Sequence, residues 1–219
     1  MTTAQYHKHF INQLKTIYEE REATQIAEWV FENITELKKW QIRMGQHEID
    51  AGILGKLNGC LGDLLLHKPV QYVLSEAWFY KRLFFVNENV LIPRPETEDI
   101  VARIVEDLQL RNIVYPLILD IGTGSGCIAV SLSKELVESS ITAIDVSNGA
   151  LNVARQNAAN LDAVIDFLLI DFLEPKEWAG LKKYDVIVSN PPYIPVKEKA
   201  SLAKNVISFE PHNALFVPD

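Results

Sequence analysis

The stretch LILDIGTGSG, Leu117–Gly126, joins an apolar run to a turn that contains three glycines. The run lacks the polar alternation of a half-exposed strand, so it predicts a strand buried in a parallel sheet. Glycine lets the backbone turn sharply and approach a ligand closely. CIAVSLSKEL follows directly and predicts a helix. The stretch therefore predicts a strand, a turn and a helix, which form the first unit of an α/β fold.

The same rhythm continues toward the carboxyl end. ITAID, VIDFLLID and YDVIVSN predict three more strands, and NGALNVARQNAANL predicts a helix between the first two of them. We expect a parallel sheet covered on both faces, with ligands beyond the carboxyl ends of its strands. The fourth strand, residues 184–190, would form an apolar, unpaired edge that can pair with another chain.

Upstream of the sheet, residues 1–76 predict a separate helical domain. Apolar residues recur at helical spacing around Phe10 and Trp29, and a third helix is expected from Gln46 to His67. The third helix carries glycines at positions 52, 55, 59 and 62, for which we expect close packing against another helix. Between the domains, residues 77–93 are aromatic and β-branched with a polar break at Lys81–Arg82, which predicts a β-hairpin linker.

Composition limits the class of protein. The 219 residues are 48% hydrophobic and carry a net charge of −8, which disfavours direct binding of nucleic acid over a large surface. Cys60 and Cys127 stand in no paired motif, as is typical of a reduced, cytoplasmic protein. The five histidines show no metal-binding spacing, and no apolar run reaches the ~18 residues that span a membrane. We expect neither a metal nor a membrane partner.

The glycine turn has an acidic neighbour. A dinucleotide fingerprint would need glycine where Cys127 stands, and no Lys-Ser or Lys-Thr pair of a phosphate-binding loop follows. Asp120 precedes the glycines instead, and a carboxylate suits the cationic half of S-adenosylmethionine but repels a pyrophosphate. The alternative is a strand-to-helix turn without a ligand. The predicted cofactor contacts in this turn are Asp120, Gly122, Thr123, Gly124, Ser125 and Gly126.

Two further strand ends complete a nucleoside site. Asp145 stands 23 residues after Gly122, about where an acid accepts hydrogen bonds from ribose hydroxyls in nucleotide-binding units. Its alternative role is to cap the next helix, for which Ser147 also qualifies. Asp171 and Phe172 end the third strand, and an acceptor beside a flat ring suits adenine. That pair is equally compatible with an ordinary strand end.

The fourth strand ends in NPPY, Asn190–Tyr193. The Asn190 side-chain oxygen and the Pro191 carbonyl are two acceptors that can hold both hydrogens of a planar nitrogen, and Tyr193 can stack on its plane. Pro192 adds rigidity, because proline fixes φ. Such a nitrogen is a poor nucleophile, and positioning it toward an electrophilic methyl is the catalysis it needs. The alternative is a strand-terminating turn with an aromatic cap.

These motifs together resemble the class I S-adenosylmethionine-dependent methyltransferases, and within them the peptide chain release factor glutamine methyltransferases. NPPY is shared with DNA adenine and ribosomal RNA guanine N-methyltransferases. The narrower resemblance depends on VLIPRPETE (Val90–Glu98), DIGTGSGCIA and FEPHNAL (Phe209–Leu215). It implies cofactor contacts from Gly122 to Gly126 and from Asp145, Phe172 and Asn190, and a substrate clamp from Asn190 to Tyr193.

The resemblance also implies a Rossmann-like sheet in the strand order 3-2-1-4, and it implies a reaction. The side-chain nitrogen of the glutamine in the Gly-Gly-Gln loop of bacterial release factors would be methylated, with S-adenosylhomocysteine as product. Residues 1–76 would help to dock the release factor, and residues 94–219 would bind the cofactor, although relatives continue with further strands. Arg94 and the segment Glu210–Asn213 belong to the resembling motifs without a chemistry that can be assigned. The alternatives are methylation of adenine or guanine in nucleic acid, or a non-catalytic cofactor-binding module.

Overall fold

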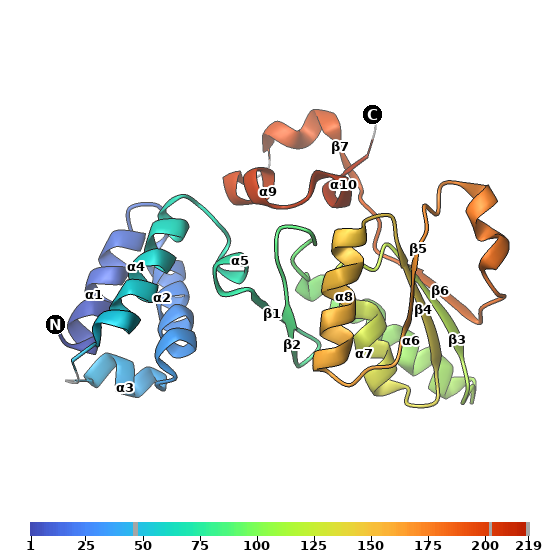
Figure 1. The fold of residues 1–219 in the computed structure, drawn as a ribbon, viewed down its shortest axis with the longest axis horizontal. Coiled ribbons are helices and arrows are strands. Elements are labelled where there is room, and N and C mark those ends of the chain that lie inside the picture. The colour runs from blue at the N-terminus through green and yellow to red at the C-terminus, as the bar shows by residue number, and fades with distance from the viewer. Residues whose placement is uncertain (46–47, 202, 218–219) are drawn as a thin grey trace. The chain divides into compact units, whose positions relative to one another are not determined.

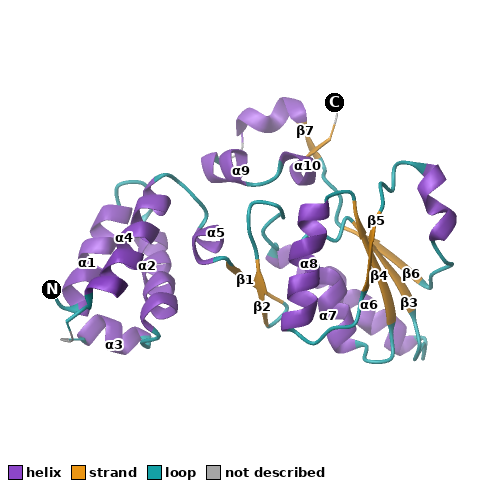
Figure 2. Ribbon diagram, in the orientation of Figure 1, coloured by secondary structure: helices purple, strands orange, loops and turns teal. Residues whose placement is uncertain are grey.

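The computed structural model describes residues 1–45, 48–201 and 203–217. The chain divides into two compact units, shown in Figures 1 and 2. One unit comprises Met1–Leu74 with Lys204–Ser208, and the other comprises Ser75–Ala203 with Phe209–Asp219. The sequence-based division places Lys204–Ser208 in the second domain, whereas its contacts group it with the first unit.

The first unit is helical, as expected. Its core contains fully buried Phe10, Phe31 and Leu57, and Phe10 meets Phe31 edge-to-face with 5.4 Å between ring centroids. Asp50 caps the fourth helix by accepting hydrogen bonds from the amides of Gly52 and Ile53. The helices of this part of the chain are α1 (Thr3–Leu14), α2 (Glu20–Thr35), α3 (Lys39–Met44), α4 (Ala51–Leu65) and α5 (Val70–Leu74).

Two expectations for the helix predicted from Gln46 to His67 are wrong. This helix is α4, which begins at Ala51 after the Asp50 cap and follows the short helix α3. The expected start at Gln46 itself lies outside the described residues. The glycines do not mediate close packing either. A Cβ built on Gly55, Gly59 or Gly62 meets no atom within 4 Å apart from the residue's chain neighbours and its own helix backbone. This strip of α4 therefore faces open space.

A hairpin begins the second unit. Strands β1 (Glu76–Phe79) and β2 (Arg82–Phe85) pair antiparallel. Tyr80 and Lys81 connect them with φ of 45° and 64°, the left-handed values that short hairpin turns require. The turn thus lies one residue before the predicted polar break. The 3-10 helix η1 (Pro95–Thr97) and α6 (Glu98–Leu110) follow the hairpin loop, and Pro95 suits the first helical position because its missing N–H is not needed there.

The parallel sheet has the expected order. Strands β3 (Leu117–Ile121), β4 (Ser140–Asp145), β5 (Asp166–Leu169) and β6 (Val186–Ser189) are arranged as β5-β4-β3-β6, which is 3-2-1-4 in chain order. Ile121 of β3 pairs in register with Ile144 of β4 and with Ser189 of β6. The strands therefore end together, and the loops that follow them meet at one edge of the sheet.

Helices cover one face of the sheet. Helix α6, helix α7 (Cys127–Glu135) and helix α8 (Asn148–Asn160) lie side by side in Figure 1. Ile118 and Val188 point into the core beneath them. Ile187 of the edge strand β6 alternates to the other face and is 62% exposed. The expectation of helices on both faces is therefore wrong at this strand among the described residues, whereas the apolar edge at β6 is present.

Two short strands beyond β6 belong to the second unit. Strands β7 (Ile194–Pro195) and β8 (Phe216–Val217) form a small parallel pair, so the residues directly after NPPY lie beside the end of the described chain. The remaining elements are the 3-10 helices η2 (Pro175–Gly180) and η3 (Val196–Ser201), and the helices α9 (Lys204–Phe209) and α10 (His212–Leu215).

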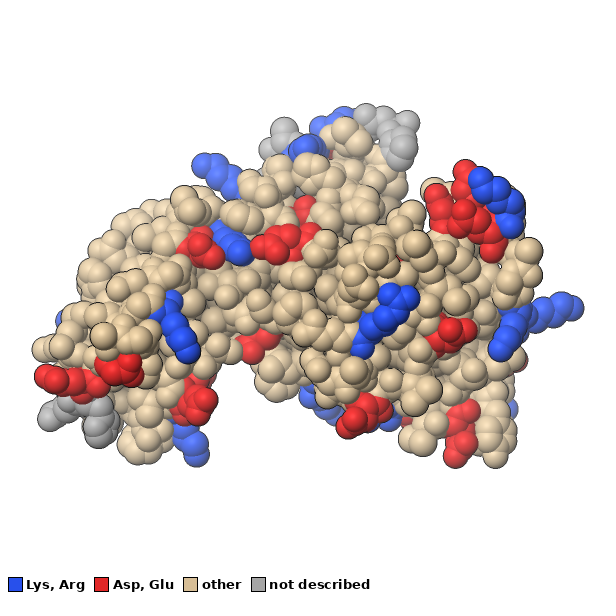
Figure 3. All heavy atoms as spheres, viewed as in Figure 1, with Lys and Arg blue, Asp and Glu red and all other residues tan. Residues whose placement is uncertain are grey.

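Charged residues are dispersed on the face that Figure 3 shows, where Lys and Arg alternate with Asp and Glu over a largely uncharged surface. Among the described residues, no group of three or more His, Cys, Asp or Glu side chains has a geometry that could hold a metal ion. The described helices include none that is both long and apolar enough to cross a membrane.

Candidate functional site

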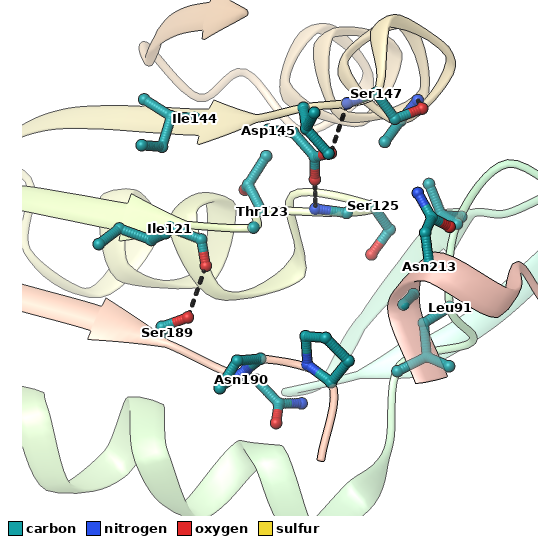
Figure 4. A pocket seen from close by; sticks show the side chains of 18 of the residues that line it. Leu91, Ile121, Thr123, Ser125, Ile144, Asp145, Ser147, Ser189, Asn190 and Asn213 are labelled. Carbon is teal, nitrogen blue, oxygen red and sulfur yellow. Dashed lines mark hydrogen bonds between the residues drawn. The ribbon is translucent and has the colours of Figure 1, made fainter. Parts of the chain in front are cut away.

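A cavity of about 490 Å³ opens at the carboxyl ends of the strands of the parallel sheet. This volume lies within the range of sites that bind small ligands. Figure 4 shows three strand ends on one side of the cavity, at Ile121, Asp145 and Ser189, with Leu91 and Asn213 on the opposite side. The cavity therefore lies where the sequence predicted a ligand.

The glycine turn forms one wall of the cavity. Gly122, Gly124 and Gly126 have φ of 70°, 55° and 78°, values that other residues rarely adopt. Gly122 to Ser125 line the cavity, whereas Gly126 lies behind them. A Cβ on Gly126 would stand 3.1 Å from the Cβ of Ala154 in α8. The turn thus needs glycine both for its backbone shape and for close packing.

Asp120 lies beneath this wall and does not line the cavity. It is 1% exposed, and its Oδ2 accepts a hydrogen bond of 2.7 Å from the Thr123 hydroxyl. Burial raises the pKa of its carboxyl to about 6, and the hydrogen bond from Thr123 opposes that rise. Its Oδ1 accepts no hydrogen bond of normal geometry among the described residues, although the Ala129 amide is near enough to lower the carboxyl's pKa somewhat. A buried carboxyl that is poorly compensated favours a nearby cation.

Asp145 joins the loop that follows β3 to the loop that follows β4. Its Oδ2 accepts a hydrogen bond from the Gly124 amide and its Oδ1 one from the Ser147 amide, each 2.9 Å long (Figure 4). Ser147, not Asp145, caps α8, because its hydroxyl accepts from the Ala150 amide. The capping alternative for Asp145 is therefore not what the structure shows. Asp145 lines the cavity, and its carboxylate retains lone pairs that can accept further hydrogen bonds.

Asp171 and Phe172 also line the cavity. Trp178 of η2 stacks on the Phe172 ring, with 5.0 Å between centroids and 21° between planes, and its indole N–H donates to the Phe172 carbonyl. Glu177 accepts a hydrogen bond from the Asp171 amide. The sequence analysis did not predict that Trp178 and Glu177 hold Phe172 and Asp171 in place, because no periodicity in η2 points to these contacts.

Asn190 lines the cavity at the end of β6. Its Nδ2 donates a hydrogen bond of 3.2 Å to the hydroxyl of buried Thr97. Because the amide nitrogen is engaged, the amide oxygen is the atom that remains to accept from a substrate. Pro191 and Pro192 line the cavity beside it, whereas Tyr193 lies outside the lining and is 76% exposed. The stacking role of Tyr193 stays a prediction.

The wall opposite the strand ends was not assigned any chemistry from sequence. It includes Leu91 to Arg94 from the loop before α6, together with Asn213 and Ala214 of α10. Glu210 lies between these segments and binds Arg94. Only the family-like strings IPRPETE and FEPHNAL signalled these residues, and neither string reveals that they meet across more than one hundred positions.

The cavity fits S-adenosylmethionine. Its described lining includes the acids Asp145 and Asp171, and Arg94 is the single cation there. The unpartnered oxygen of Asp120 adds negative potential behind the turn. A ligand with a sulfonium, an ammonium and vicinal hydroxyls matches these donors and acceptors, and a polyphosphate does not.

Comparison with known proteins places this geometry in context. The family model of the methyltransferase small domain matches residues 102–213. A release factor glutamine methyltransferase of Flavobacterium psychrophilum is 40% identical over 221 residues, covering 100% of this chain and 77% of that protein. The protein of the same description from Leptospira interrogans is 47% identical over 156 residues, which cover 69% of this chain and 53% of the relative. This chain thus spans between about half and about three quarters of these two relatives.

Among solved structures, the hMettl16 catalytic domain in complex with the MAT2A 3'UTR hairpin 6 overlaps 77% of this chain and 58% of that chain, with 18% identity and a TM-score of 0.47.

Proposed function

The chain belongs to the release factor glutamine methyltransferase family, and from this premise we propose that it methylates the side-chain amide nitrogen of the glutamine in the Gly-Gly-Gln loop of peptide chain release factors. The observation that carries the proposal is the orientation of Asn190. Asn190 lines the cavity, and its amide nitrogen donates to Thr97, so its amide oxygen is the atom left to accept a hydrogen bond from a substrate. A glutamine carboxamide is a donor of the matching kind.

The residues of the cavity divide the work. Asp145, Phe172 and the turn from Gly122 to Ser125 would hold the cofactor. S-adenosylmethionine, when bound, supplies a methyl group on a sulfonium sulfur and leaves as S-adenosylhomocysteine. The Asn190 oxygen and the Pro191 carbonyl would hold the two amide hydrogens of glutamine. This fixes the direction of the nitrogen and stabilises the positive charge that develops on it. The nitrogen forms one bond to carbon and releases one proton to solvent, so no strong general base is needed.

The alternative substrate class, a base in nucleic acid, has less support. Binding to nucleic acid depends mainly on Lys and Arg at phosphates. Arg94 is the only cation among the described residues that line the cavity, and it is already paired with Glu210. The net charge of −8 points the same way. The helical unit, Met1–Leu74, we assign to docking of the release factor.

The test is methyl transfer from radiolabelled S-adenosylmethionine to a purified release factor. We expect label on the glutamine of the Gly-Gly-Gln loop and none on a release factor in which alanine replaces that glutamine. Ribosomal RNA and DNA are offered in parallel reactions. Label on either nucleic acid, with none on the release factor, would overturn the proposal.

A further inference from the structure

Glu210 is a buried carboxylate that the proposed reaction does not use. Its side chain is 1% exposed. Oε1 accepts a hydrogen bond of 2.6 Å from Nη2 of Arg94, and Oε2 accepts one of 3.2 Å from the backbone amide of Ile92. A buried charge is costly unless it is paired and hydrogen-bonded, and Glu210 satisfies both conditions. Both partners belong to the same short loop, more than one hundred residues earlier in the chain.

The Glu210 contacts join the two segments that form one wall of the cavity. The loop from Leu91 to Arg94 is one segment, and Asn213 and Ala214, shortly after Glu210 in the chain, are the other. Leu91 and Asn213 accordingly lie on the same side of the cavity in Figure 4. A single carboxylate therefore fastens the wall that faces the strand ends.

The same contacts lead to Asn190. Glu210 holds the Arg94 side chain, and the Arg94 carbonyl accepts a hydrogen bond of 3.0 Å from the Thr97 amide. The Thr97 hydroxyl in turn accepts the hydrogen bond from Asn190 Nδ2. The hydrogen bonds are linked through the covalent structure of Arg94 and Thr97, so a shift of the Arg94 backbone is transmitted to the hydroxyl that orients Asn190. The cofactor side of the cavity, made by the turns after β3, β4 and β5, is not part of this chain of contacts.

We propose that Glu210 is a positioning residue that holds the acceptor side of the cavity, acting through Arg94 and Thr97 on the orientation of Asn190. This inference rests on the proposed function insofar as Asn190 receives the glutamine. Its effect falls on the rate of methyl transfer rather than on cofactor affinity, because the contacts of Glu210 end at the acceptor side. Misplacing a substrate-orienting group by about 1 Å can lower a rate ~100-fold.

The first measurement does not depend on the reaction. Hydrogen exchange of the Ile92 amide is compared in the wild type, Glu210→Ala and Glu210→Gln. Glu210→Ala removes the acceptor and should speed exchange at Ile92 at least about tenfold. Glu210→Gln keeps an acceptor and should fall between. Asp107→Ala is the matched control, because it breaks the exposed Asp107–Arg111 pair of α6 and touches neither wall. If the Ile92 amide exchanges at the same rate in Glu210→Ala as in the wild type, Glu210 does not hold the Leu91–Arg94 loop and the proposal is wrong.

The second measurement separates transfer from cofactor binding. In Glu210→Ala we expect kcat for the release factor to fall between about tenfold and a hundredfold, with the calorimetric Kd for S-adenosylmethionine within about twofold of wild type. Glu210→Gln should recover part of kcat, and Asp107→Ala should match the wild type. An unchanged kcat, or equal losses of kcat and cofactor affinity, would overturn the positioning role.

If Glu210→Ala does not fold, kcat is measured instead for Arg94→Lys and Arg94→Ala, which change the partner of Glu210. Lysine retains the charge and should preserve most of kcat, whereas alanine should reproduce the loss. If both match the wild type, the proposal is wrong. Wild-type protein that methylates no release factor would refute the proposed function instead, and the exchange at Ile92 would still decide whether Glu210 fastens the wall.

Discussion

Replacing Asp120 by asparagine should change how stability depends on pH. Burial raises the pKa of the Asp120 carboxyl to about 6, compared with 3.8 for an exposed aspartate. The folded protein therefore holds this proton to higher pH than the unfolded chain does. The resulting stability is complete below the unfolded pKa and is lost as pH rises through the folded pKa. At 1.36 kcal/mol per pKa unit, a shift of about two units amounts to ~3 kcal/mol.

The assay is urea unfolding of the α/β unit, followed by circular dichroism at pH values between about 4 and 8. Asparagine cannot ionise, so Asp120→Asn should gain ~3 kcal/mol relative to the wild type between about pH 4 and pH 7.5. An amide hydrogen left without an acceptor would cost ~1–3 kcal/mol at every pH. This cost lowers the free energy of unfolding of Asp120→Asn by the same amount at every pH, so the difference in pH dependence between the two proteins is unaffected. Asp107→Asn, an exposed aspartate of α6, provides the control.

Parallel curves for the wild type and Asp120→Asn would refute the reasoning. They would mean that the Asp120 carboxyl is neutralised or solvated in the free protein. In that case it would not supply the negative potential that we assign to the cavity for a cationic cofactor.

The remaining predictions concern the two sides of the cavity. Asn190→Ala should abolish methyl transfer while most cofactor affinity survives in calorimetry; equal loss of both would mean that Asn190 serves the cofactor. Asp145→Ala should do the reverse, weakening cofactor binding first, because it also releases the Gly124 and Ser147 amides; full affinity would exclude it from the nucleoside site. Thr97→Val should lower kcat about tenfold, the effect of ~1.4 kcal/mol from one hydrogen bond. Thr97→Ser should restore activity, and a serine variant as slow as valine would argue against orientation through the hydroxyl.

The sheet could be predicted because its evidence is local. Apolar runs that end in Ile121 or Ser189 indicate buried strands by their own composition. The order 3-2-1-4 was expected from the family resemblance, because right-handed connections between parallel strands allow more than one order. The strip of glycines in α4 shows the limit of this reasoning. Residue size predicts that two helices can approach closely, but it does not say whether a second helix is there.

The cofactor side of the site was also accessible from sequence, because each strand end carries its own residue type. The acceptor side was not, since it depends on contacts between distant segments. Glu210 meets Ile92 and Arg94 only after the chain has returned from the excursion beyond β7. Thr97 reads as part of a helix start, and nothing in its neighbours reveals a partner at position 190. No periodicity encodes such pairs.

The exposed glycines of α4 are sites at which substitution by alanine should stabilise the protein. Alanine at Gly55, Gly59 or Gly62 would meet no atom within 4 Å outside its chain neighbours and its own helix backbone. Each such change in a helix interior is worth up to ~1 kcal/mol, and intrinsic helix propensities sum along one helix. The three alanines together should raise the free energy of unfolding of the helical unit by ~2–3 kcal/mol. None of the three positions is among the residues that line the cavity.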